Sequence, residues 1–503
     1  MAQPKVIVIG SGFSGLSAAT CLADQGYNVT VLEKNTTPGG RARSFSAEGF
    51  TFDMGPSWYW MPDVFESYFN KFGKSTSDYY DLIRLDPSYK VIFGSADIVD
   101  VPASLDELRN LFEKWEKGSA KKLDDFLEQA AYKYDVGINQ LVYKPGRSLN
   151  EFMSLQLLMD IMRMDVFRSI HKHIRRFFRH EKIIKLLEFP ILFLGALPAN
   201  TPALYSLMNY ADIKLGTWYP MGGMYKIVEA MVQLAEEKGV KFLYGQDVRE
   251  IQVSNGVATG VSTTLDVIEA DIIVASADYH HVETKLLAKK DRSYSAKYWD
   301  TRVMAPSSLL FYLGVGKRLQ NLKHHNLFFD EDFGPHAQEI YEIPKWPTKP
   351  LFYVSAPSVT DSTVAPEGCE NLFLLIPVAP GLHDSEETRE YYYNLIMDRL
   401  ERITKQDIRS AVIFKRSYAH RDFIQDYNAF KGNAYGLANT LLQTALLKPS
   451  LKSKKVKNLF YTGQLTVPGP GVPPSLISGR VVAAEVAKEY AVTRAEAALI
   501  STI

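Results

Sequence analysis

The chain has 503 residues, 46% of them hydrophobic, which is enough to bury a large core in about two to four domains. Basic and acidic side chains balance at 57 each, so no net charge attracts the protein to nucleic acid. Two cysteines and ten histidines show neither a disulfide framework nor metal-ligand spacing, and the first predicted strand begins so close to Met1 that we expect no signal peptide. These features predict a protein of the reducing cytoplasm that holds no metal.

A glycine-rich turn follows the first predicted strand, the β-branched run of residues 5–9. Gly10 permits a tight turn out of the strand, and Gly12 lets a pyrophosphate approach the backbone. Gly15 lets the next predicted helix, residues 14–25, pack against the sheet and point its N-terminal N–H groups at the phosphates. The spacing therefore predicts a dinucleotide-binding unit.

The second predicted strand, residues 28–32, ends at Glu33, whose carboxylate can accept hydrogen bonds from the ribose hydroxyls of an adenosine. We expect Lys34 beside it, and Phe13 and Ser14 at the start of the helix, to line the same site. Both FAD and NAD use this unit, so it leaves the choice between them open.

Two motifs follow at once: a Gly-Gly-Arg turn at residues 39–41 and an Asp-x-Gly-x element at residues 53–56. They resemble the second fingerprint of the FAD-dependent amine oxidase and carotenoid desaturase superfamily. The resemblance implies FAD as the cofactor, with an arginine fork against its pyrophosphate and the second element beside the flavin. The residues concerned are Gly40, Arg41, Gly55, Pro56 and Ser57.

The region of residues 458–479 reads as a strand, a glycine- and proline-rich turn and the start of a helix. It resembles the C-terminal signature of the bacterial-type phytoene desaturases, which implies a second helix N-terminus aimed at the middle of the cofactor. It departs from that signature where Gln464 and Leu465 replace small residues and at Pro470. The resemblance places Gly463, Gln464, Gly471 and Val472 at the cofactor.

Further matches lie at residues 218–231, 270–287 and 426–437, and they imply that Asp278 and Val248 lie on the adenosine side. The resemblance therefore covers essentially the whole chain. The chain is similar to the carotenoid desaturases of the bacterial phytoene-desaturase type, and most of all to flavobacterial enzymes that desaturate acyclic 1-hydroxycarotenoids at C3–C4.

The order of elements predicts an α/β fold in which a Rossmann-type FAD-binding domain is interleaved with an α+β substrate-binding domain. Both ends of the chain must meet at one ligand. We expect FAD-binding segments at residues 1–99, 218–299 and 431–503. The substrate segments are then residues 100–217, mostly helical and membrane-associated, and 300–430.

A basic amphipathic stretch at residues 163–185 precedes a stretch without charge at residues 189–211. Pro190, Pro198 and Pro202 interrupt the second stretch, so it does not read as a membrane-spanning helix. One interpretation is a monotopic protein lying on an anionic membrane surface; the other is a solvated helix followed by a buried loop. Because a carotenoid dissolves in the membrane, the resemblance favours peripheral association with the cytoplasmic membrane.

The resemblance implies that hydride leaves an acyclic carotenoid for the flavin and that a proton leaves the neighbouring carbon. No residue pattern identifies the base, so catalytic residues stay unassigned, and the electrons go on to a quinone or to oxygen. The alternatives are a phytoene desaturase making lycopene, a carotenoid isomerase and, as a protein without activity, an isoprenoid-binding escort.

Overall fold

A computed structural model describes residues 3–147, 164–166, 168–192, 197–440, 443 and 447–491. Its first layer is a sheet with the strand order β19-β13-β1-β2-β9, in which every neighbouring pair is parallel. β-branched residues dominate its central strands, as expected for strands covered on both faces. The strands are β1 (Lys5–Ile9), β2 (Asn28–Glu33), β9 (Lys241–Tyr244), β13 (Ile272–Ala275) and β19 (Leu459–Tyr461).

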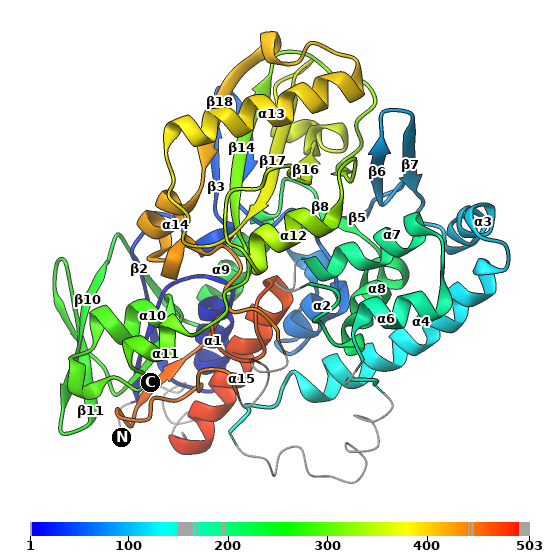
Figure 1. The fold of residues 1–503 in the computed structure, drawn as a ribbon. Helices are drawn as coiled ribbons and strands as arrows, with labels where there is room; N and C mark the ends of the chain where they lie inside the picture. Colours follow the sequence, from blue (N-terminus) through cyan, green and yellow to red (C-terminus); the bar gives the residue numbers. More distant parts are fainter. Residues whose placement is uncertain are drawn as a thin grey trace.

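Three long helices pack on this sheet: α1 (Phe13–Asp24), α9 (Tyr225–Glu237) and α15 (Val472–Glu489). Helices α1 and α15 lie side by side although they come from opposite ends of the chain (Figure 1). The Ser17 hydroxyl on α1 donates to the Leu476 carbonyl at 2.8 Å. A Cβ at Gly479 would overlap the backbone of α1, so glycine is needed for this close approach.

The second layer is a seven-stranded sheet with the order β18-β14-β17-β16-β15-β6-β7. Its long central strands are buried on both faces. Phe311 and Leu374 pack toward α13 (Glu386–Thr404), whereas Leu310 and Leu375 point into the core shared with the first layer. Figure 1 shows α13 lying across the outer face of this sheet. The strands are β6 (Tyr89–Gly94), β7 (Asp97–Val101), β14 (Ser307–Val315), β15 (His325–Phe328), β16 (Phe352–Ser355), β17 (Glu370–Val378) and β18 (Val412–Tyr418).

A group of helices gathers beside β6 and β7 (Figure 1). These are α3 (Leu105–Trp115), α4 (Ser119–Val136), α6 (Ile170–Phe177), α7 (Glu181–Leu192) and α8 (Leu207–Tyr210). Smaller elements complete the fold: β3 (Ser44–Ala47), β4 (Phe50–Asp53), β5 (Leu82–Arg84), β8 (Trp218–Pro220), β10 (Val248–Ser254), β11 (Val257–Thr263), β12 (Val267–Glu269), α2 (Pro62–Asn70), α10 (Tyr279–His281), α11 (Ala296–Asp300), α12 (Phe333–Tyr341) and α14 (His420–Tyr427).

The parallel sheet takes its strands from the three segments expected to bind FAD, residues 1–99, 218–299 and 431–503. The seven-stranded sheet takes most of its strands from residues 300–430 but also includes β6 and β7. The boundary expected at residue 99 therefore falls inside β7. β6 pairs in parallel with β15, where Lys90 lies opposite Asn326, and this contact between distant segments has no local sequence signal.

Several apolar residues of the charge-free stretch are buried in the core. Phe189, Ile191 and Leu207 are 1%, 0% and 7% exposed and belong to the main core, so for these residues the structure agrees with the buried-loop interpretation. Arg163, Phe167 and residues 193–196, which belong to the same two stretches, lie outside the described residues. In the described ranges, no helix is both long enough and apolar enough to cross a bilayer.

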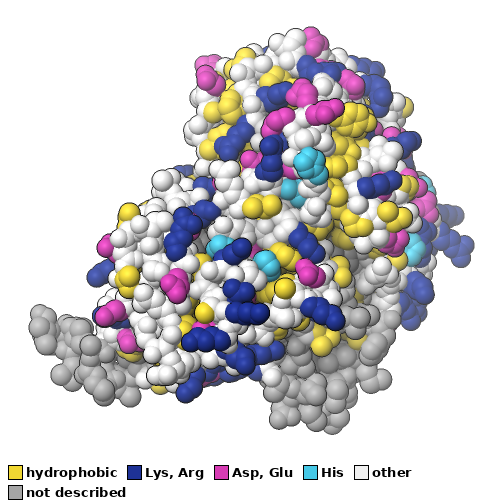
Figure 2. Space-filling view, turned by 60° about the vertical axis from the view of Figure 1, so that its left-hand side comes forward, with side chains coloured by type: hydrophobic (Ala, Val, Ile, Leu, Met, Phe, Trp, Pro, Cys, Tyr) yellow, Lys and Arg dark blue, Asp and Glu magenta, His cyan; other side chains and the backbone are white. Residues whose placement is uncertain are grey.

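Basic side chains of the amphipathic stretch do lie at the surface, with Lys172, Arg176 and Arg179 exposed. Elsewhere the charges are mixed. Figure 2 shows one face on which basic, acidic and apolar side chains are interspersed, with basic side chains more numerous over its lower part. The described residues include no cluster of three or more histidine, cysteine or acidic side chains that could hold a metal ion.

Candidate active site

The glycine-rich turn after β1 forms one wall of a cavity. Gly10 has φ +98° and donates its backbone N–H to the Leu32 carbonyl at 2.8 Å, which ties the turn to β2. A Cβ at Gly15 would overlap the Gly10 carbonyl oxygen, so only glycine lets α1 start this close to the strand. A Cβ at Gly12 would meet nothing within 4 Å, because it would enter the cavity. This space at the N-terminus of α1 suits a pyrophosphate.

Glu33 closes β2 and is buried beside the turn. One of its oxygens, Oε2, accepts hydrogen bonds from the Ser11 backbone N–H at 2.9 Å and hydroxyl at 2.6 Å. Oε1 accepts from the backbone and side-chain N–H groups of Asn35, both at 2.9 Å. These bonds occupy roughly all of the acceptor positions of a carboxylate. Glu33 therefore fixes two cavity loops, and a ribose hydroxyl would share an oxygen with one of them.

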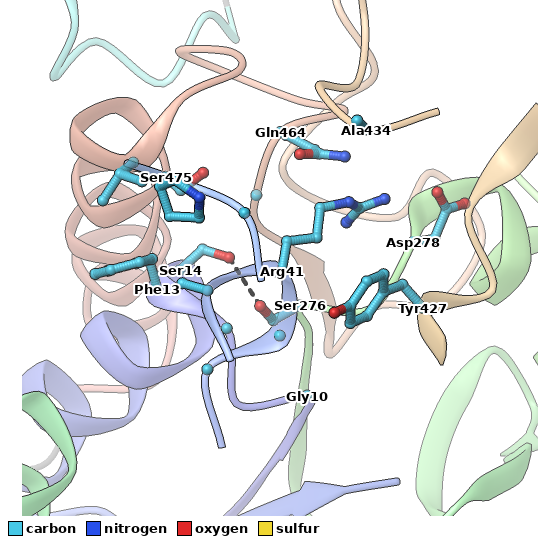
Figure 3. A pocket seen from close by; sticks show the side chains of 18 of the residues that line it. Gly10, Phe13, Ser14, Arg41, Ser276, Asp278, Tyr427, Ala434, Gln464 and Ser475 are labelled. Atoms are coloured by element: carbon cyan, nitrogen blue, oxygen red, sulfur yellow. Dashed lines mark hydrogen bonds between the residues drawn. The ribbon is translucent and has the colours of Figure 1, made fainter. Parts of the chain in front are cut away.

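Arg41 points into the cavity from the Gly-Gly-Arg turn (Figure 3). Its guanidinium lies 5.3 Å from the ring centre of Tyr427 and donates to the Asn433 carbonyl at 3.3 Å. With the Gln464 amide turned so that its oxygen faces the arginine, both terminal nitrogens of Arg41 donate to it, at 3.1 and 3.2 Å. Burial lowers the pKa of Arg41, and the nearby Asp278 carboxylate opposes that shift. This places a cation in the middle of the cavity.

Asp278 follows β13 at the carboxyl end of the parallel sheet. Its carboxylate accepts from the backbone N–H groups of His281 and Phe430, both at 3.1 Å. Burial raises its pKa and Arg41 opposes the shift. The two groups are drawn facing one another across the cavity in Figure 3.

The last βα unit supplies a second helix N-terminus. Gly471, with φ +111°, precedes α15, and Val472 is the first residue of that helix. The Ser478 hydroxyl accepts from the Gly463 backbone N–H at 3.0 Å and donates to the Val467 carbonyl at 2.7 Å, so it holds both sides of the glycine- and proline-rich turn. The turn therefore closes over the same cavity as the turn after β1.

One cavity brings together almost all of the residues expected at the cofactor. Gly15 is the exception, because it lies beneath the turn against the Gly10 carbonyl. The members that line the cavity are Gly10, Gly12, Phe13, Ser14, Glu33, Lys34, Gly40, Arg41, Gly55, Pro56, Ser57, Val248, Asp278, Gly463, Gln464, Gly471 and Val472.

Sequence reasoning missed Gln246, Tyr427 and Asn428, which line the same cavity. Gln246 could have been found, because it follows β9 at the carboxyl edge of the parallel sheet, where such folds bind ligands. Tyr427 and Asn428 come from the end of α14 and reach the cavity only through tertiary packing.

Beyond Gly55 and Pro56 the cavity becomes apolar and aromatic. The residues that line this chamber are Trp58, Trp60, Met61, Phe65, Met208, Ser308, Leu310, Tyr353, Leu375 and Tyr435. None of these described side chains is acidic or basic. The site thus joins a polar dinucleotide cradle to a chamber suited to a long hydrocarbon.

Comparison with known proteins identifies the class. The family model for flavin containing amine oxidoreductases matches residues 13–487. An oxidoreductase from Methanosarcina mazei has the same fold, with a TM-score of 0.59 at 17% identity over 95% of this chain and 99% of its own. A fatty acid isomerase from P. acnes has a TM-score of 0.60 at 14% identity, covering 97% and 99%. The chain belongs to the flavin-containing amine oxidoreductase family.

Three curated relatives show to which group of this family the chain belongs. A carotenoid 3,4-desaturase from Haloarcula japonica is 40% identical over 487 residues, which cover 97% of this chain and 98% of that protein. A zeta-carotene-forming phytoene desaturase from Myxococcus xanthus is 34% identical, covering 95% and 93%. A 4,4'-diapophytoene desaturase from Staphylococcus haemolyticus is 32% identical, covering 95% and 97%. Within the family the chain is a member of the carotenoid desaturase group, and its cofactor is FAD.

The cradle fits this cofactor. The space that a Cβ at Gly12 would fill is open, as a bound pyrophosphate requires. Two buried polar atoms that line or border it, Arg41 Nε and Gln246 Oε1, have no hydrogen-bond partner among the described residues. Both are placed to bind a polar ligand, since buried polar groups are normally paired.

Proposed function

We propose that the protein introduces the C3–C4 double bond into an acyclic 1-hydroxycarotenoid during carotenoid biosynthesis. The observation that carries this proposal is the cavity itself, in which a dinucleotide cradle opens directly into an apolar, aromatic chamber. The resemblance to a 3,4-desaturase at 40% identity, above the 34% and 32% found for two phytoene desaturases, supports the position of the new bond.

Bound FAD supplies the acceptor for the hydride that leaves the substrate. The protein has to align one C–H bond of the substrate with this hydride acceptor and keep water out of the chamber. Leu310 and Leu375 on the inner face of the seven-stranded sheet, together with Trp58 and Trp60 after β4, form walls that do both. The chamber has no acidic or basic side chain among its described lining residues, so positive charge on the reacting carbon is left to the conjugated polyene to stabilise.

We further propose that the protein works at the membrane surface, where its substrate dissolves, and that its electrons pass to a quinone or to oxygen. The exposed basic side chains of the α6–α7 region, Lys172, Arg176 and Arg179, support an electrostatic contact with an anionic leaflet. Because many of the described apolar residues of that region are buried, this contact would depend on charge more than the sequence pattern predicted.

The test is incubation of the FAD-loaded protein with phytoene, lycopene and 1-hydroxylycopene, each in lipid vesicles with an electron acceptor. We expect a red-shifted product from 1-hydroxylycopene, two mass units lighter than the substrate, and little product from phytoene. Conversion of phytoene to lycopene would replace the proposal with a phytoene desaturase. An absorption change without loss of mass would indicate an isomerase. Failure of the protein to take up FAD during loading, together with no conversion of any substrate, would favour an escort protein.

A further inference from the structure

A row of three side chains crosses the inner face of the seven-stranded sheet. Leu310 on β14 lies opposite Leu375 on β17, and Leu375 lies opposite Tyr353 on β16. All three line the chamber. Two of them are hydrocarbon, so the Tyr353 hydroxyl is the hydrogen-bonding group of this row.

A buried histidine holds this hydroxyl. His325 Nδ1 lies 2.5 Å from the Tyr353 oxygen, and the imidazole stacks on Trp58 with ring centres 4.1 Å apart and planes 11° apart. His325 is fully buried. The phenol and the imidazole are therefore fixed in position by β15, β16 and the segment after β4.

The unpaired nitrogen of His325 indicates which atom carries the proton. Nε2 is buried and has no hydrogen-bond partner among the described residues. An orphaned N–H is rarer in proteins than an orphaned acceptor. With the proton on Nδ1, His325 donates to the Tyr353 oxygen, and the phenol proton can be donated to a neighbouring serine hydroxyl or to a ligand in the chamber.

The location suits a substrate hydroxyl close to the reacting carbons. An oxygen on C1 is four covalent bonds from C4, so it lies within roughly 5 Å of that carbon. Tyr353 has Ser57 as a near neighbour, and Ser57 directly follows Gly55 and Pro56, the segment expected beside the flavin. A group that recognises the C1 hydroxyl must lie in this part of the cavity.

The protonation states of Tyr353 and His325 favour hydrogen bonding to a substrate hydroxyl over proton transfer. Burial raises the pKa of Tyr353, against smaller effects of the Ser355 and Ser57 hydroxyls, and burial lowers the pKa of His325 well below its ordinary value. Both groups therefore stay neutral around neutral pH. A neutral pair can exchange hydrogen bonds with a hydroxyl but is a poor proton acceptor.

We infer that Tyr353, held by His325, is a specificity-determining residue that binds the C1 hydroxyl of the substrate. This inference rests on the proposed function and adds the subsite that recognises the hydroxylated end. A site that hydrogen-bonds a substrate hydroxyl discriminates against the analogue that lacks it, because its own polar group is then left unpaired.

The experiment compares 1-hydroxylycopene with lycopene in wild-type protein, Tyr353→Phe and a control, Tyr392→Phe. Tyr392 is also a buried tyrosine with one hydrogen bond, to the Pro347 carbonyl, but it packs outside the cavity on α13. We expect Tyr353→Phe to reduce the preference for the hydroxylated substrate by about tenfold, mainly through KM. The control should keep the wild-type preference.

Binding gives a second readout without turnover. In anaerobically reduced protein, quenching of tryptophan fluorescence should show weaker binding of 1-hydroxylycopene to Tyr353→Phe and unchanged binding of lycopene. Equal losses for both carotenoids would overturn the inference. So would a fall in kcat on both substrates with a shifted pH profile, which would make the pair a proton relay. If wild-type protein itself shows no preference for the hydroxyl, the proposed function fails rather than the assignment of Tyr353.

Discussion

Gly12 and Gly15 stand three residues apart in the same turn, yet a methyl group would meet different surroundings at each. At Gly12 it would enter the open cavity, and at Gly15 it would overlap the Gly10 carbonyl. The missing side chain at Gly12 leaves room for a ligand, whereas the missing side chain at Gly15 lets α1 pack against the turn.

We therefore expect Gly12→Val to fold but to be purified without flavin colour, because the side chain fills the pyrophosphate space. Gly15→Val should be recovered poorly or unfold at a lower temperature. Gly94→Val is a control for the substitution, since a Cβ there also meets nothing within 4 Å and Gly94 lies outside the cavity lining. The measurements are flavin absorbance per protein and thermal unfolding. Stoichiometric FAD in Gly12→Val would place the pyrophosphate elsewhere.

Glu33 combines a structural and a binding role, because its two oxygens accept from Ser11 and Asn35. Glu33→Ala leaves those donors unpaired and removes the expected ribose contact, so FAD affinity should fall by about 10- to 100-fold, or roughly 1.5–3 kcal/mol. Glu33→Gln keeps one acceptor oxygen and should lose less. Titration of the apoprotein with FAD checks this order, and unchanged affinity in Glu33→Ala would refute it.

At the scale of elements, Asp212 joins the helical region to β6. Its carboxylate accepts from the Tyr89 hydroxyl at 2.8 Å and the Thr217 hydroxyl at 3.2 Å. Thr217 in turn accepts from the indole N–H of Trp60, a residue of the chamber wall, at 2.8 Å. Burial raises the pKa of Asp212 from 3.8 to about 7, against the effect of the two hydroxyls.

This shift predicts a pH dependence of stability. As pH rises from about 4 to about 7, the unfolded chain loses the Asp212 proton while the folded protein retains it, so the folded state becomes less favoured by up to ~4 kcal/mol. Asp212→Asn cannot ionise and should show a smaller fall in unfolding temperature between about pH 5 and about pH 8. Glu387→Gln, at an exposed position on α13, is the control. An identical fall in Asp212→Asn and wild type would contradict the assignment.

The α6–α7 region carries the electrostatic part of the membrane proposal. Arg175 pairs with Glu181, so we choose Lys172, Arg176 and Arg179, whose side chains have no acidic partner among the described residues. Each basic side chain near an anionic leaflet contributes about 1 kcal/mol, and salt screens it. Reversing all three to glutamate should lower binding to anionic vesicles by at least about tenfold and leave bound FAD unchanged.

Sedimentation with vesicles checks this expectation at low and high salt. The control reverses three other exposed lysines, Lys285, Lys289 and Lys290, which lie between β13 and α11. If both triple variants bind as the wild type does, Lys172, Arg176 and Arg179 do not contribute to membrane binding.

At the scale of the whole molecule, the features predicted from the sequence are those that local rules determine. The turn after β1, the helix that follows it and the acid at the end of β2 were predicted with nearly correct bounds, because steric and hydrophobic patterns act within a few residues. Two other features were not predicted: the pairing of β6 with β15 and the contact between His325 and Tyr353. Both depend on which distant segments meet, and only tertiary packing decides that.

The charge-free stretch of residues 189–211 is a second case in which the sequence pattern does not reveal a tertiary contact. Its composition was compatible with both a lipid contact and a buried loop. In the structure Phe189 is buried, because its ring packs against Trp58, Trp60 and Tyr89 beside the chamber. Apolar composition alone therefore could not decide between the two interpretations, because it does not identify the surface that covers an apolar side chain.

The central claim is that this cavity couples oxidation of a carotenoid to reduction of its own FAD. The most direct measurement is an anaerobic single turnover of FAD-loaded protein with 1-hydroxylycopene and no other acceptor. The account predicts that flavin absorbance bleaches as the polyene spectrum shifts to the red, with one flavin reduced for each double bond formed. A polyene that changes while the flavin stays oxidised, or a flavin that bleaches without a new double bond, would contradict it.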